Sequence, residues 1–378
     1  MSGTSLDGVD GVLAEAPGNG AAWQARAHAH LPLAADLRAE LLALNQRDGS
    51  DELHRAALAT NALMTLYAQV VASLLGQAGM AHGQVSAIGA HGQTVRHRPG
   101  EFDGLGYTLQ LMNGALLAER TGIDVVCDFR TRDVAAGGQG APLVPAFHAA
   151  RFACAGQDTA VLNIGGMANL TLLRADGQVS GFDCGPGNVL LDLWCRRHQQ
   201  RRYDAGGAWA ASGSVDAGLL ARCLAEPYFS LPPPKSTGRD LFNEDWLNAC
   251  LGKESLPAPD VMATLTELTA RSASEALQRQ APGTTRLLVC GGGAFNAYLM
   301  SRLSHLLDPG VNVQSTAAEG VPPDQVEALA FAWLAQAFAE HRSGNLPAVT
   351  GAAGPRLLGA LYPAGAQARR VTPPSIRR

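Results

Sequence analysis

Two short segments combine small, flexible residues with carboxylates in a pattern suited to binding phosphate. The first is Met1–Asp10, which reads Met-Ser-Gly-Thr-Ser-Leu-Asp-Gly-Val-Asp, and the second is Gly181–Asn188, which reads Gly-Phe-Asp-Cys-Gly-Pro-Gly-Asn. Glycine lets backbone N–H groups approach an anion, hydroxyl groups add donors, and aspartate can hold a metal ion or accept a proton. Because the segments lie roughly half a chain apart, they indicate a phosphate site built by two related halves, as in a kinase.

The composition is typical of a well-packed enzyme with room for two domains. The 378 residues are 47% hydrophobic and 16% charged, with a formal net charge of −4, which argues against a general nucleic-acid or membrane binder. The seven cysteines are odd in number and form no Cys-x-x-Cys pair, so they predict reduced thiols and neither a disulfide framework nor a zinc site. We recognise no signal peptide and no apolar run of bilayer-spanning length. We therefore expect a cytoplasmic protein.

The elements that must position these segments alternate between helices and strands. Apolar residues recur at helical spacing, or form short runs bounded by glycine and polar residues. The predicted helices are Leu53–Gly79, Met262–Leu277, Phe295–Leu307 and Asp324–Ala339. The predicted buried strands are Val85–Ala90, Ile123–Cys127, Thr159–Ile164, Leu170–Leu173 and Arg286–Cys290. This alternation predicts an α/β architecture.

Two connecting segments suggest how the chain is organised. A glycine and polar turn leading into an apolar strand occurs at Gly3–Val12 and again at Gly165–Leu173, which is either an internal repeat or a coincidence between common turns. The switch between the halves is expected near Gly137–Pro145. The proline-rich segment Tyr228–Gly238 is a long loop and a candidate substrate lid.

Eight motifs, taken together and in order from the first residue to about Leu361, closely resemble the anhydro-N-acetylmuramic acid kinase family. The motifs are Met1–Asp10, His91–Thr94, Asp128–Arg130, Gly137–Pro145, Asn163–Asn169, Asp183–Asn188, Lys235–Asp240 and Cys290–Gly293. One glycine motif would be weak support, whereas eight in register are strong.

The resemblance implies an actin/Hsp70/sugar-kinase fold with ribonuclease H-like halves, closing over ATP and sugar in an interdomain cleft. The expected N-terminal domain is 1–140, completed by about 345–365, followed by a C-terminal domain 141–344 and a flexible basic tail 366–378. The implied reaction converts ATP, water and 1,6-anhydro-N-acetylmuramic acid into N-acetylmuramic acid 6-phosphate and ADP, in cell-wall recycling. A homodimer is also expected.

Asp183 is the catalytic residue that the resemblance implies. The matching aspartate acts as the general base for the water that attacks the anomeric carbon, and neighbours such as Phe182 can tune its pKa. Without the resemblance, an aspartate before Cys-Gly-Pro-Gly would be interpreted as a turn-stabilising residue. Glu327, near the start of a predicted helix, is a candidate second carboxylate beside that water, or a carboxylate on a solvated helix face.

The resemblance also implies where ATP and Mg²⁺ bind. The expected ATP-binding residues are Gly3, Thr4, Ser5, Leu6, Asp7, Gly8, Val9, Asp10, Gly165, Gly166, Asn169, Gly291, Gly292 and Gly293. Asp7 or Asp10 is expected to support Mg²⁺ through water, because that ion prefers oxygen ligands. Taken alone, the first loop is a hairpin turn with a capping serine, and the triple glycine is an ordinary strand-to-helix turn.

Residues around the sugar follow from three further motifs. The expected substrate-binding residues are His91, Gln93, Thr94, Arg130 and Asp133. The planar fork of an arginine matches the two oxygens of the lactyl carboxylate, and Arg96, Arg98, Arg130 and Arg239 are all candidates for that role. The alternative interpretation of His91 is a satisfied core histidine.

Two other functions use the same features: an ordinary hexosamine kinase in which water takes no part, and a non-catalytic ATP-binding clamp or regulator. Family members usually have a strand before the turn at which this chain starts. We therefore expect roughly ten further β-prone residues upstream in the native protein.

Overall fold

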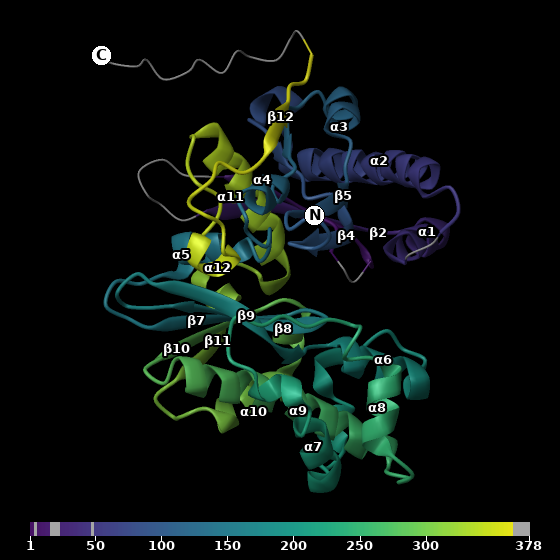
Figure 1. The fold of residues 1–378 in the computed structure, drawn as a ribbon, viewed down its shortest axis with the longest axis vertical. Coiled ribbons are helices and arrows are strands. Elements are labelled where there is room, and N and C mark those ends of the chain that lie inside the picture. The colour runs from purple at the N-terminus through teal and green to yellow at the C-terminus, as the bar shows by residue number, and fades with distance from the viewer. Residues whose placement is uncertain (4–5, 16–22, 47–48, 366–378) are drawn as a thin grey trace. The chain divides into compact units, whose positions relative to one another are not determined.

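The computed structural model describes residues 1–3, 6–15, 23–46 and 49–365. The chain forms two compact units, which we call unit 1 (Met1–Leu143 with Glu327–Arg378) and unit 2 (Val144–Val326). Both units combine helices and strands, which confirms the predicted α/β class (Figure 1).

The described part of unit 1 contains three small sheets and the longest helix among the described residues. Its elements are β1 (Gly8–Glu15), β2 (Gln24–Pro32), α1 (Ala35–Asn45), α2 (Glu52–Ala78), β3 (Ile88–Gly89), β4 (Gln93–Pro99), β5 (Gly106–Leu111), α3 (Gly114–Thr121), β6 (Val125–Cys127), α4 (Thr131–Ala135), α11 (Val326–Ala339), α12 (Pro347–Thr350) and β12 (Ala360–Tyr362). Strands β1 and β2 pair antiparallel, as do β4 and β5, while β12, β6 and β3 form a three-stranded sheet. The predicted strand 85–90 is shorter than expected, because only Ile88 and Gly89 find partners on β6.

Helix α2 covers the β1–β2 pair through one apolar stripe. Its buried residues are Ala59, Leu63, Met64, Tyr67, Val70 and Leu74. By length and hydropathy alone this helix also meets the criteria for a membrane span, contrary to the expectation that no apolar run would do so. A helix packed on the core of a protein meets the same criteria, and the apolar stripe of α2 is typical of such a helix. The composition of α2 is therefore only weak support for a membrane span.

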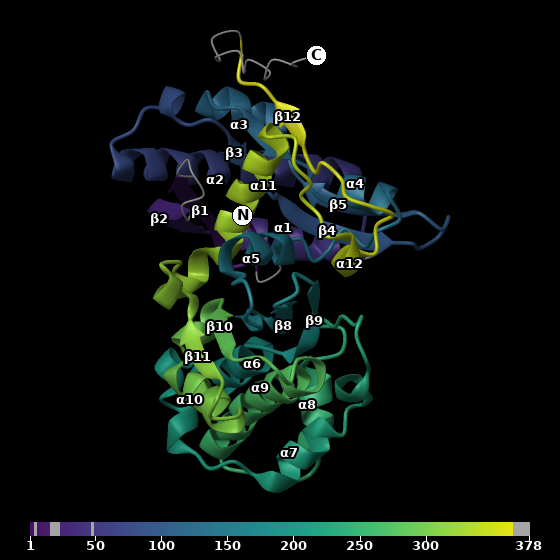
Figure 2. The same cartoon turned by 90° about the vertical axis from the view of Figure 1, so that its left-hand side faces the viewer.

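Unit 2 is built around one five-stranded sheet in the order β11-β10-β7-β8-β9. Its elements are α5 (Val144–Phe152), β7 (Thr159–Ile164), β8 (Met167–Leu173), β9 (Val179–Pro186), α6 (Val189–Gln199), α7 (Ala217–Leu224), α8 (Glu244–Leu251), α9 (Ala258–Gln280), β10 (Arg286–Cys290), α10 (Ala297–Leu306) and β11 (Asn312–Ser315). In both ribbon views α5 lies on one face of this sheet, and α9 and α10 lie on the other (Figures 1 and 2). The core consists of apolar side chains from β7, β8, β9, β10, α9 and α10.

The second unit boundary differs from the expected one at residue 344. From Glu327 onward, α11 belongs to unit 1, where the ring of Phe331 lies 4.6 Å from that of His91 and 5.7 Å from that of Phe129. Gly89 of β3 lies against the Phe331 carbonyl, so closely that any side chain there would collide with the helix backbone. Helix α11 is therefore held in unit 1 by close contact with β3, which its own sequence does not reveal.

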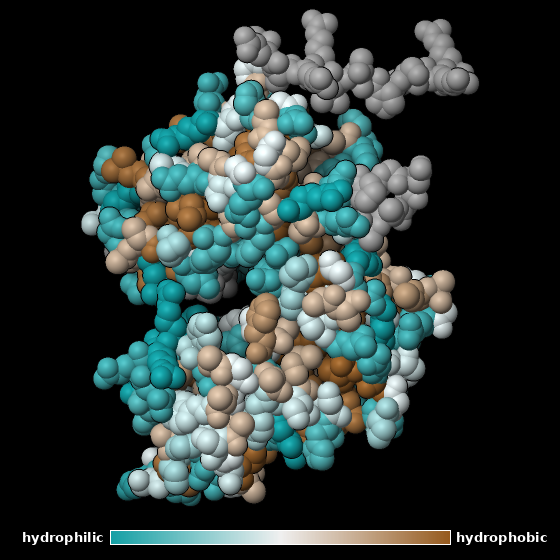
Figure 3. Space-filling view, turned by 180° about the vertical axis from the view of Figure 1, so that it is seen from behind, coloured by the Kyte–Doolittle hydropathy of each residue, from teal (hydrophilic) through white to brown (hydrophobic). Residues whose placement is uncertain are grey.

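Hydrophilic residues predominate on the face drawn in Figure 3, where apolar residues form separate patches. Among the described residues, large exposed hydrophobic side chains include Leu53 and Phe102. Scattered apolar groups of this kind are normal on a surface that faces water.

Candidate functional site

Asp183 lies on β9 of unit 2 and is fixed by three contacts with one returning segment. Its Oδ2 accepts a hydrogen bond from the Thr237 backbone N–H at 3.0 Å. Its own N–H donates to the Lys235 carbonyl at 3.1 Å, and its carbonyl accepts from the Tyr228 hydroxyl at 2.7 Å. All three contacts come from the 228–238 segment, so the loop expected to be a lid is tied to Asp183 at both of its ends.

The surroundings of Asp183 change the acidity of its carboxyl group. Burial raises the pKa of Asp183 to about 6, against the opposing effects of the Thr237 hydrogen bond and the Lys235 charge. A carboxyl group with a pKa near neutrality can both take and release a proton in the physiological range. Perturbed groups of this kind concentrate at catalytic sites.

The expected phosphate turn at Gly165 and Gly166 lies beside Asp183. Asn169 of β8 is the cross-strand partner of Asp183 on β9. The Gly165 carbonyl accepts from the Asn188 N–H at 2.8 Å, and the Gly166 carbonyl accepts from the Gly187 N–H at 2.9 Å. The turn is therefore pinned to the start of α6, in the same unit as Asp183.

The triple-glycine loop closes the same edge of the sheet. Strands β7 and β10 are parallel neighbours, so their carboxyl ends meet where Gly291–Gly293 follows β10. Gly291 has a φ of +77°, and a side chain there would collide with Asn163, while one at Gly293 would collide with Ile164. Close approach of two loops thus requires these glycines, and it places Gly291, Gly292 and Gly293 beside the turn that begins at Gly165.

The first loop turns tightly within unit 1. The Asp10 N–H donates to the Met1 carbonyl at 2.9 Å, and the Leu6 N–H donates to the Gly3 carbonyl at 3.3 Å. Leu6 is buried with a φ of +54°, a conformation that side chains rarely adopt, and Val9 is also buried. A side chain at Gly8 would collide with His30. Thr4 and Ser5, which were expected to face phosphate, lie outside the described residues.

The two aspartates of this loop differ in their surroundings. Asp7 is exposed, whereas Asp10 Oδ1 lies 2.9 Å from His30 Nδ1 and 3.6 Å from His28 Nε2. Among the described residues, no group of three or more His, Cys, Asp or Glu side chains is placed to hold a metal ion. Mg²⁺ usually keeps several waters and takes one or two carboxylates plus substrate phosphates, so either aspartate fits the ion as part of a nucleotide complex.

His91 and Arg130, separated by 39 residues, form a buried pair in unit 1. Arg130 donates from Nε at 3.1 Å and from Nη2 at 2.9 Å to His91 Nε2, while its Nη1 donates to the Gly140 carbonyl at 2.8 Å. His91 Nδ1 donates to the Gly92 carbonyl at 2.9 Å. Burial and the Arg130 charge hold the pKa of His91 well below its usual value. The imidazole is therefore neutral, and both of its nitrogens have protein partners.

The other expected sugar residues also have protein partners. Gln93 is buried and accepts from the Ser2 hydroxyl at 2.5 Å, and Thr94 accepts from Gln110 Nε2 at 3.2 Å. Asp133 is fully buried. Its carboxylate accepts three hydrogen bonds at 2.7–2.8 Å, from Gly140 N–H, Asn345 Nδ2 and Thr350 Oγ1. Asp133 thus joins α4 to the segment 345–350, and its role in binding the sugar stays a prediction.

Glu327 joins the charged groups of unit 1. Burial raises the pKa of its carboxyl, the Arg130 charge opposes that rise, and Asp10 and Asp7 reinforce it. Burial also lowers the pKa of Arg130 to about 10. Glu327 is half-buried and lies within electrostatic range of Arg130 and both aspartates, which favours a second carboxylate over an ordinary helix-face glutamate.

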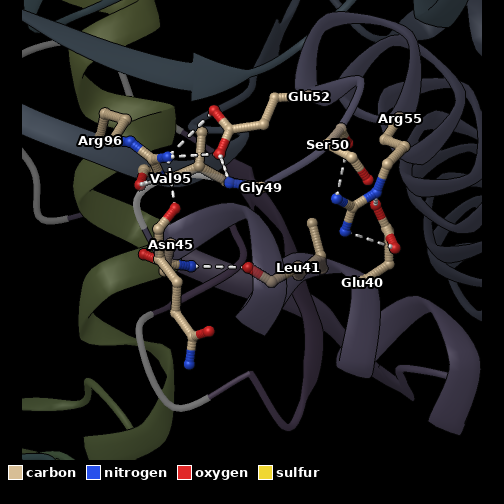
Figure 4. Close-up of polar contacts among 10 residues, drawn as sticks. Glu40, Leu41, Asn45, Gly49, Ser50, Glu52, Arg55, Val95 and Arg96 are labelled. Atoms are coloured by element: carbon tan, nitrogen blue, oxygen red, sulfur yellow. Dashed lines mark hydrogen bonds and ion pairs between the residues drawn. The ribbon is translucent and has the colours of Figure 1, made fainter.

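The four arginines that are candidates for binding the substrate carboxylate differ in their protein contacts. Arg96 is bound to the Gln46 carbonyl at 2.5 Å. It also donates to both oxygens of Glu52 at 3.2 Å, as the close-up in Figure 4 shows. Arg98 lies 3.9 Å from Glu101, and Arg130 is committed to His91. Arg239 is exposed, and its Nη2 lies 3.9 Å from the point where a side chain on Gly166 would begin.

The sequence did not indicate that some residues lie close to Asp183. Tyr228 and Thr237 lie in or beside the proline-rich loop, which gave no sign of contact with β9. Thr269 of α9 is buried, and its hydroxyl lies 3.1 Å from the carbonyls of both Pro186 and Gly187, supporting the turn after Asp183. The only signal available for Lys235 and Thr237 was their membership of the motif 235–240.

Comparisons with known proteins agree with these features. The family model described as anhydro-N-acetylmuramic acid kinase matches residues 1–364. Two proteins of that name are each 60% identical to this chain. The protein of Variovorax paradoxus (strain S110) aligns over 96% of this chain and 98% of its own length, and that of Bordetella petrii over 96% and 95%.

Among solved structures, the activator of the 2-hydroxyisocaproyl-CoA dehydratase from Clostridium difficile with bound ADPNP matches with a TM-score of 0.39. The two chains share 12% identity over 70% of this chain and 78% of that chain, a similarity too distant to support a conclusion. The family match, by contrast, extends over nearly the whole chain at high identity. The chain therefore belongs to the anhydro-N-acetylmuramic acid kinase family and is a kinase.

Proposed function

We propose that this chain uses ATP and water to convert 1,6-anhydro-N-acetylmuramic acid into N-acetylmuramic acid 6-phosphate and ADP. The observation that carries the proposal is the setting of Asp183, whose half-buried carboxyl has a pKa of about 6 beside the Gly165–Gly166 turn. A kinase that also opens an anhydro ring needs one base that can accept a proton from water near neutral pH. Asp183 has that property.

In the proposed reaction Asp183 removes a proton from the water that attacks the anomeric carbon. The bond between that carbon and the bridging oxygen breaks, and the bridging oxygen becomes the nucleophile that attacks the γ-phosphate. The bond from the γ-phosphate to ADP breaks, and the proton stays on Asp183 until solvent removes it. The contacts favour this role because Thr237 binds the carboxylate and Tyr228 fixes the main chain of Asp183 before substrate arrives.

The remaining residues bind and orient. In unit 2, the backbone of Gly165, Gly166 and Gly291–Gly293 is proposed to receive the nucleotide, with Asn169 beside it. In unit 1, Gly3–Asp10 is proposed to receive phosphate. Asp7 or Asp10 would hold Mg²⁺ through water, and the ion would neutralise phosphate charge when bound. His91, Gln93, Thr94 and Arg130 are proposed to shape the sugar site, and Glu327 to assist the water.

The wider setting is also a proposal. All seven cysteines are free thiols in the structure, which supports a reducing compartment such as the cytoplasm. The substrate is a fragment of cell-wall peptidoglycan, so we place the reaction in its recycling. We further propose a homodimer, which sedimentation of the purified protein would test.

The function is tested by Asp183→Asn, which keeps the shape of the side chain and removes its basicity. Ring opening and phosphate transfer should be lost together, by about 100-fold or more, while ATP binding measured by calorimetry is retained. Product analysis by mass spectrometry in ¹⁸O-labelled water follows both steps, because one labelled oxygen should enter at the anomeric position. The matched control is Asp245→Asn, at an exposed carboxylate in the first turn of α8, which should leave turnover unchanged.

Two outcomes would contradict the proposal in different ways. Product without ¹⁸O would indicate an ordinary hexosamine kinase, in which Asp183 deprotonates a sugar hydroxyl. Near-normal ring opening by Asp183→Asn would show that another group is the base.

A further inference from the structure

The chain from Tyr228 to Thr237 leaves β9 and returns to it, making contact with Asp183 through three different groups. A tyrosine hydroxyl, a backbone carbonyl and a backbone N–H bind the Asp183 carbonyl, N–H and carboxylate, respectively. Only the Thr237 contact touches the carboxylate. The other two fix the main chain of Asp183 and thereby set the direction of its side chain.

The side chain of Lys235 closes this returning segment on itself. Its Nζ donates to the Tyr228 carbonyl at 3.1 Å and lies 3.4 Å from the Phe229 carbonyl. The same ammonium lies 4.6 Å from the centre of the Tyr228 ring, within the range of a cation–π interaction. Lys235 therefore holds in place the tyrosine whose hydroxyl binds Asp183.

The charge of Lys235 acts on Asp183 as well. The titratable and charged groups that interact with this ammonium or with Asp183 lie on three elements. They are Asp183 and Cys184 on β9, Tyr228 on the returning segment and Arg279 on α9. Burial lowers the pKa of Lys235, and the Lys235 charge lowers that of Asp183. The cation thus favours the ionised carboxylate, the form that accepts a proton.

Lysine is an unusual choice in this chain. Only Lys235 and Lys253 are lysines, and the other basic side chains among the 29 Lys and Arg residues are arginines. A compact ammonium with three rotatable donors can reach two carbonyls and an aromatic face, whereas the broad guanidinium of an arginine has a fixed, planar fork. This geometry suits lysine.

We propose that Tyr228 and Lys235 form a clamp that orients Asp183 for its part in the reaction. We call these two residues the Tyr228–Lys235 clamp. Both are positioning residues, since they act on the substrate through Asp183. The inference rests on the proposed role of Asp183 as the base.

The clamp is tested by Lys235→Met, Lys235→Arg and Tyr228→Phe in the full-length chain, with Lys253→Met as the matched control at an exposed site. Lys235→Met should lower kcat about tenfold or more with little change in KM for ATP or the sugar, because a misplaced base costs rate and not binding. The acidic limb of its profile of kcat against pH should move to higher pH, because Asp183 loses a neighbouring cation that favours the ionised carboxylate.

The other variants separate charge from position. Lys235→Arg should keep the acidic limb near that of the parent while kcat falls. Tyr228→Phe should lower kcat without moving the limb. Lys253→Met should match the parent in every measurement.

A chemical readout covers the case in which Lys235→Met does not fold. In the native parent, an amine-reactive acetylating reagent should modify Lys235 more slowly than Lys253, as followed by mass spectrometry of the two peptides. Tyr228→Phe keeps the ring and both carbonyls and should leave this rate unchanged, whereas Tyr228→Leu, which removes the ring, should accelerate modification of Lys235. Equal rates for both lysines in the parent would show that the ammonium is not held.

The results also distinguish this inference from the proposed function. If Asp183→Asn is inactive but Lys235→Met retains the parental kcat and acidic limb, the clamp is wrong and the base assignment stands. If Asp183→Asn is active, the base assignment itself is wrong.

Discussion

Replacing Asp133 with asparagine should destabilise unit 1, because the Asp133 carboxylate is a buried acceptor for three donors. Asp133 Oδ2 accepts from the Gly140 N–H at 2.7 Å, and its Oδ1 accepts from Asn345 Nδ2 at 2.7 Å and Thr350 Oγ1 at 2.8 Å. The side chain is fully buried, so no water can replace a lost partner. Two of the three contacts join residues more than 200 positions apart, with separations of 212 to Asn345 and 217 to Thr350.

The magnitude follows from counting donors. In Asp133→Asn the amide NH₂ must face either the Gly140 N–H or the Asn345 and Thr350 donors. The Thr350 hydroxyl can rotate and accept, but Asn345 cannot flip without losing the bond from Arg356 N–H to its Oδ1 at 2.7 Å. At least one buried donor is therefore opposed by another donor, which costs about 2–4 kcal/mol. Thr350→Val removes one donor cleanly and should cost about 1 kcal/mol.

The assay is urea unfolding combined with amide hydrogen exchange read by mass spectrometry. Exchange separates the two units, which need not unfold together. Peptides from 130–143 and 345–356 should lose protection in Asp133→Asn, while peptides from 159–190 in unit 2 serve as the internal reference. The double variant of Asp133→Asn with Thr350→Val should be less destabilised than the sum of the single changes.

A different result would restore the prediction made from the sequence. If Asp133→Asn unfolds at the parental urea concentration but raises KM for the sugar, Asp133 is a substrate contact and the three-donor reasoning is refuted. Loss of protection that begins in unit 2 would also contradict it.

Two further predictions concern stability. Burial lowers the pKa of His148 to about 3, so below about pH 6.5 the unfolded state binds a proton that the folded state takes up only near pH 3. The free energy of unfolding should therefore fall by up to about 1.4 kcal/mol per pH unit as the pH drops below about 6.5. His148→Gln should flatten that slope in urea titrations at pH 7 and pH 5. Gly89→Ala should destabilise by about 1–3 kcal/mol, because its methyl group meets the Phe331 carbonyl. Gly76→Ala in α2, where a methyl group meets open space, should instead stabilise slightly, and equal melting temperatures for these two variants would contradict the packing explanation.

Local sequence patterns were enough to predict the most regular elements. Thr159–Ile164 and Arg286–Cys290 are strands with the predicted bounds, because each is a short apolar run followed at once by glycine. The four predicted helices are present, since apolar spacing over three or more turns specifies a buried face. The order of glycine motifs was likewise enough to identify the family, which the match over residues 1–364 confirms.

Which polar groups meet depends on how the chain folds back on itself. Local patterns set backbone preference and the buried face, but they do not say where a distant segment returns. The contact of Tyr228 with Asp183 spans 45 residues, and that of Arg130 with His91 spans 39. The sequence offered Arg130 as one of four equivalent arginines. In the folded chain the guanidinium of Arg130 binds the buried His91, because donors that are shielded from water must find acceptors within the protein.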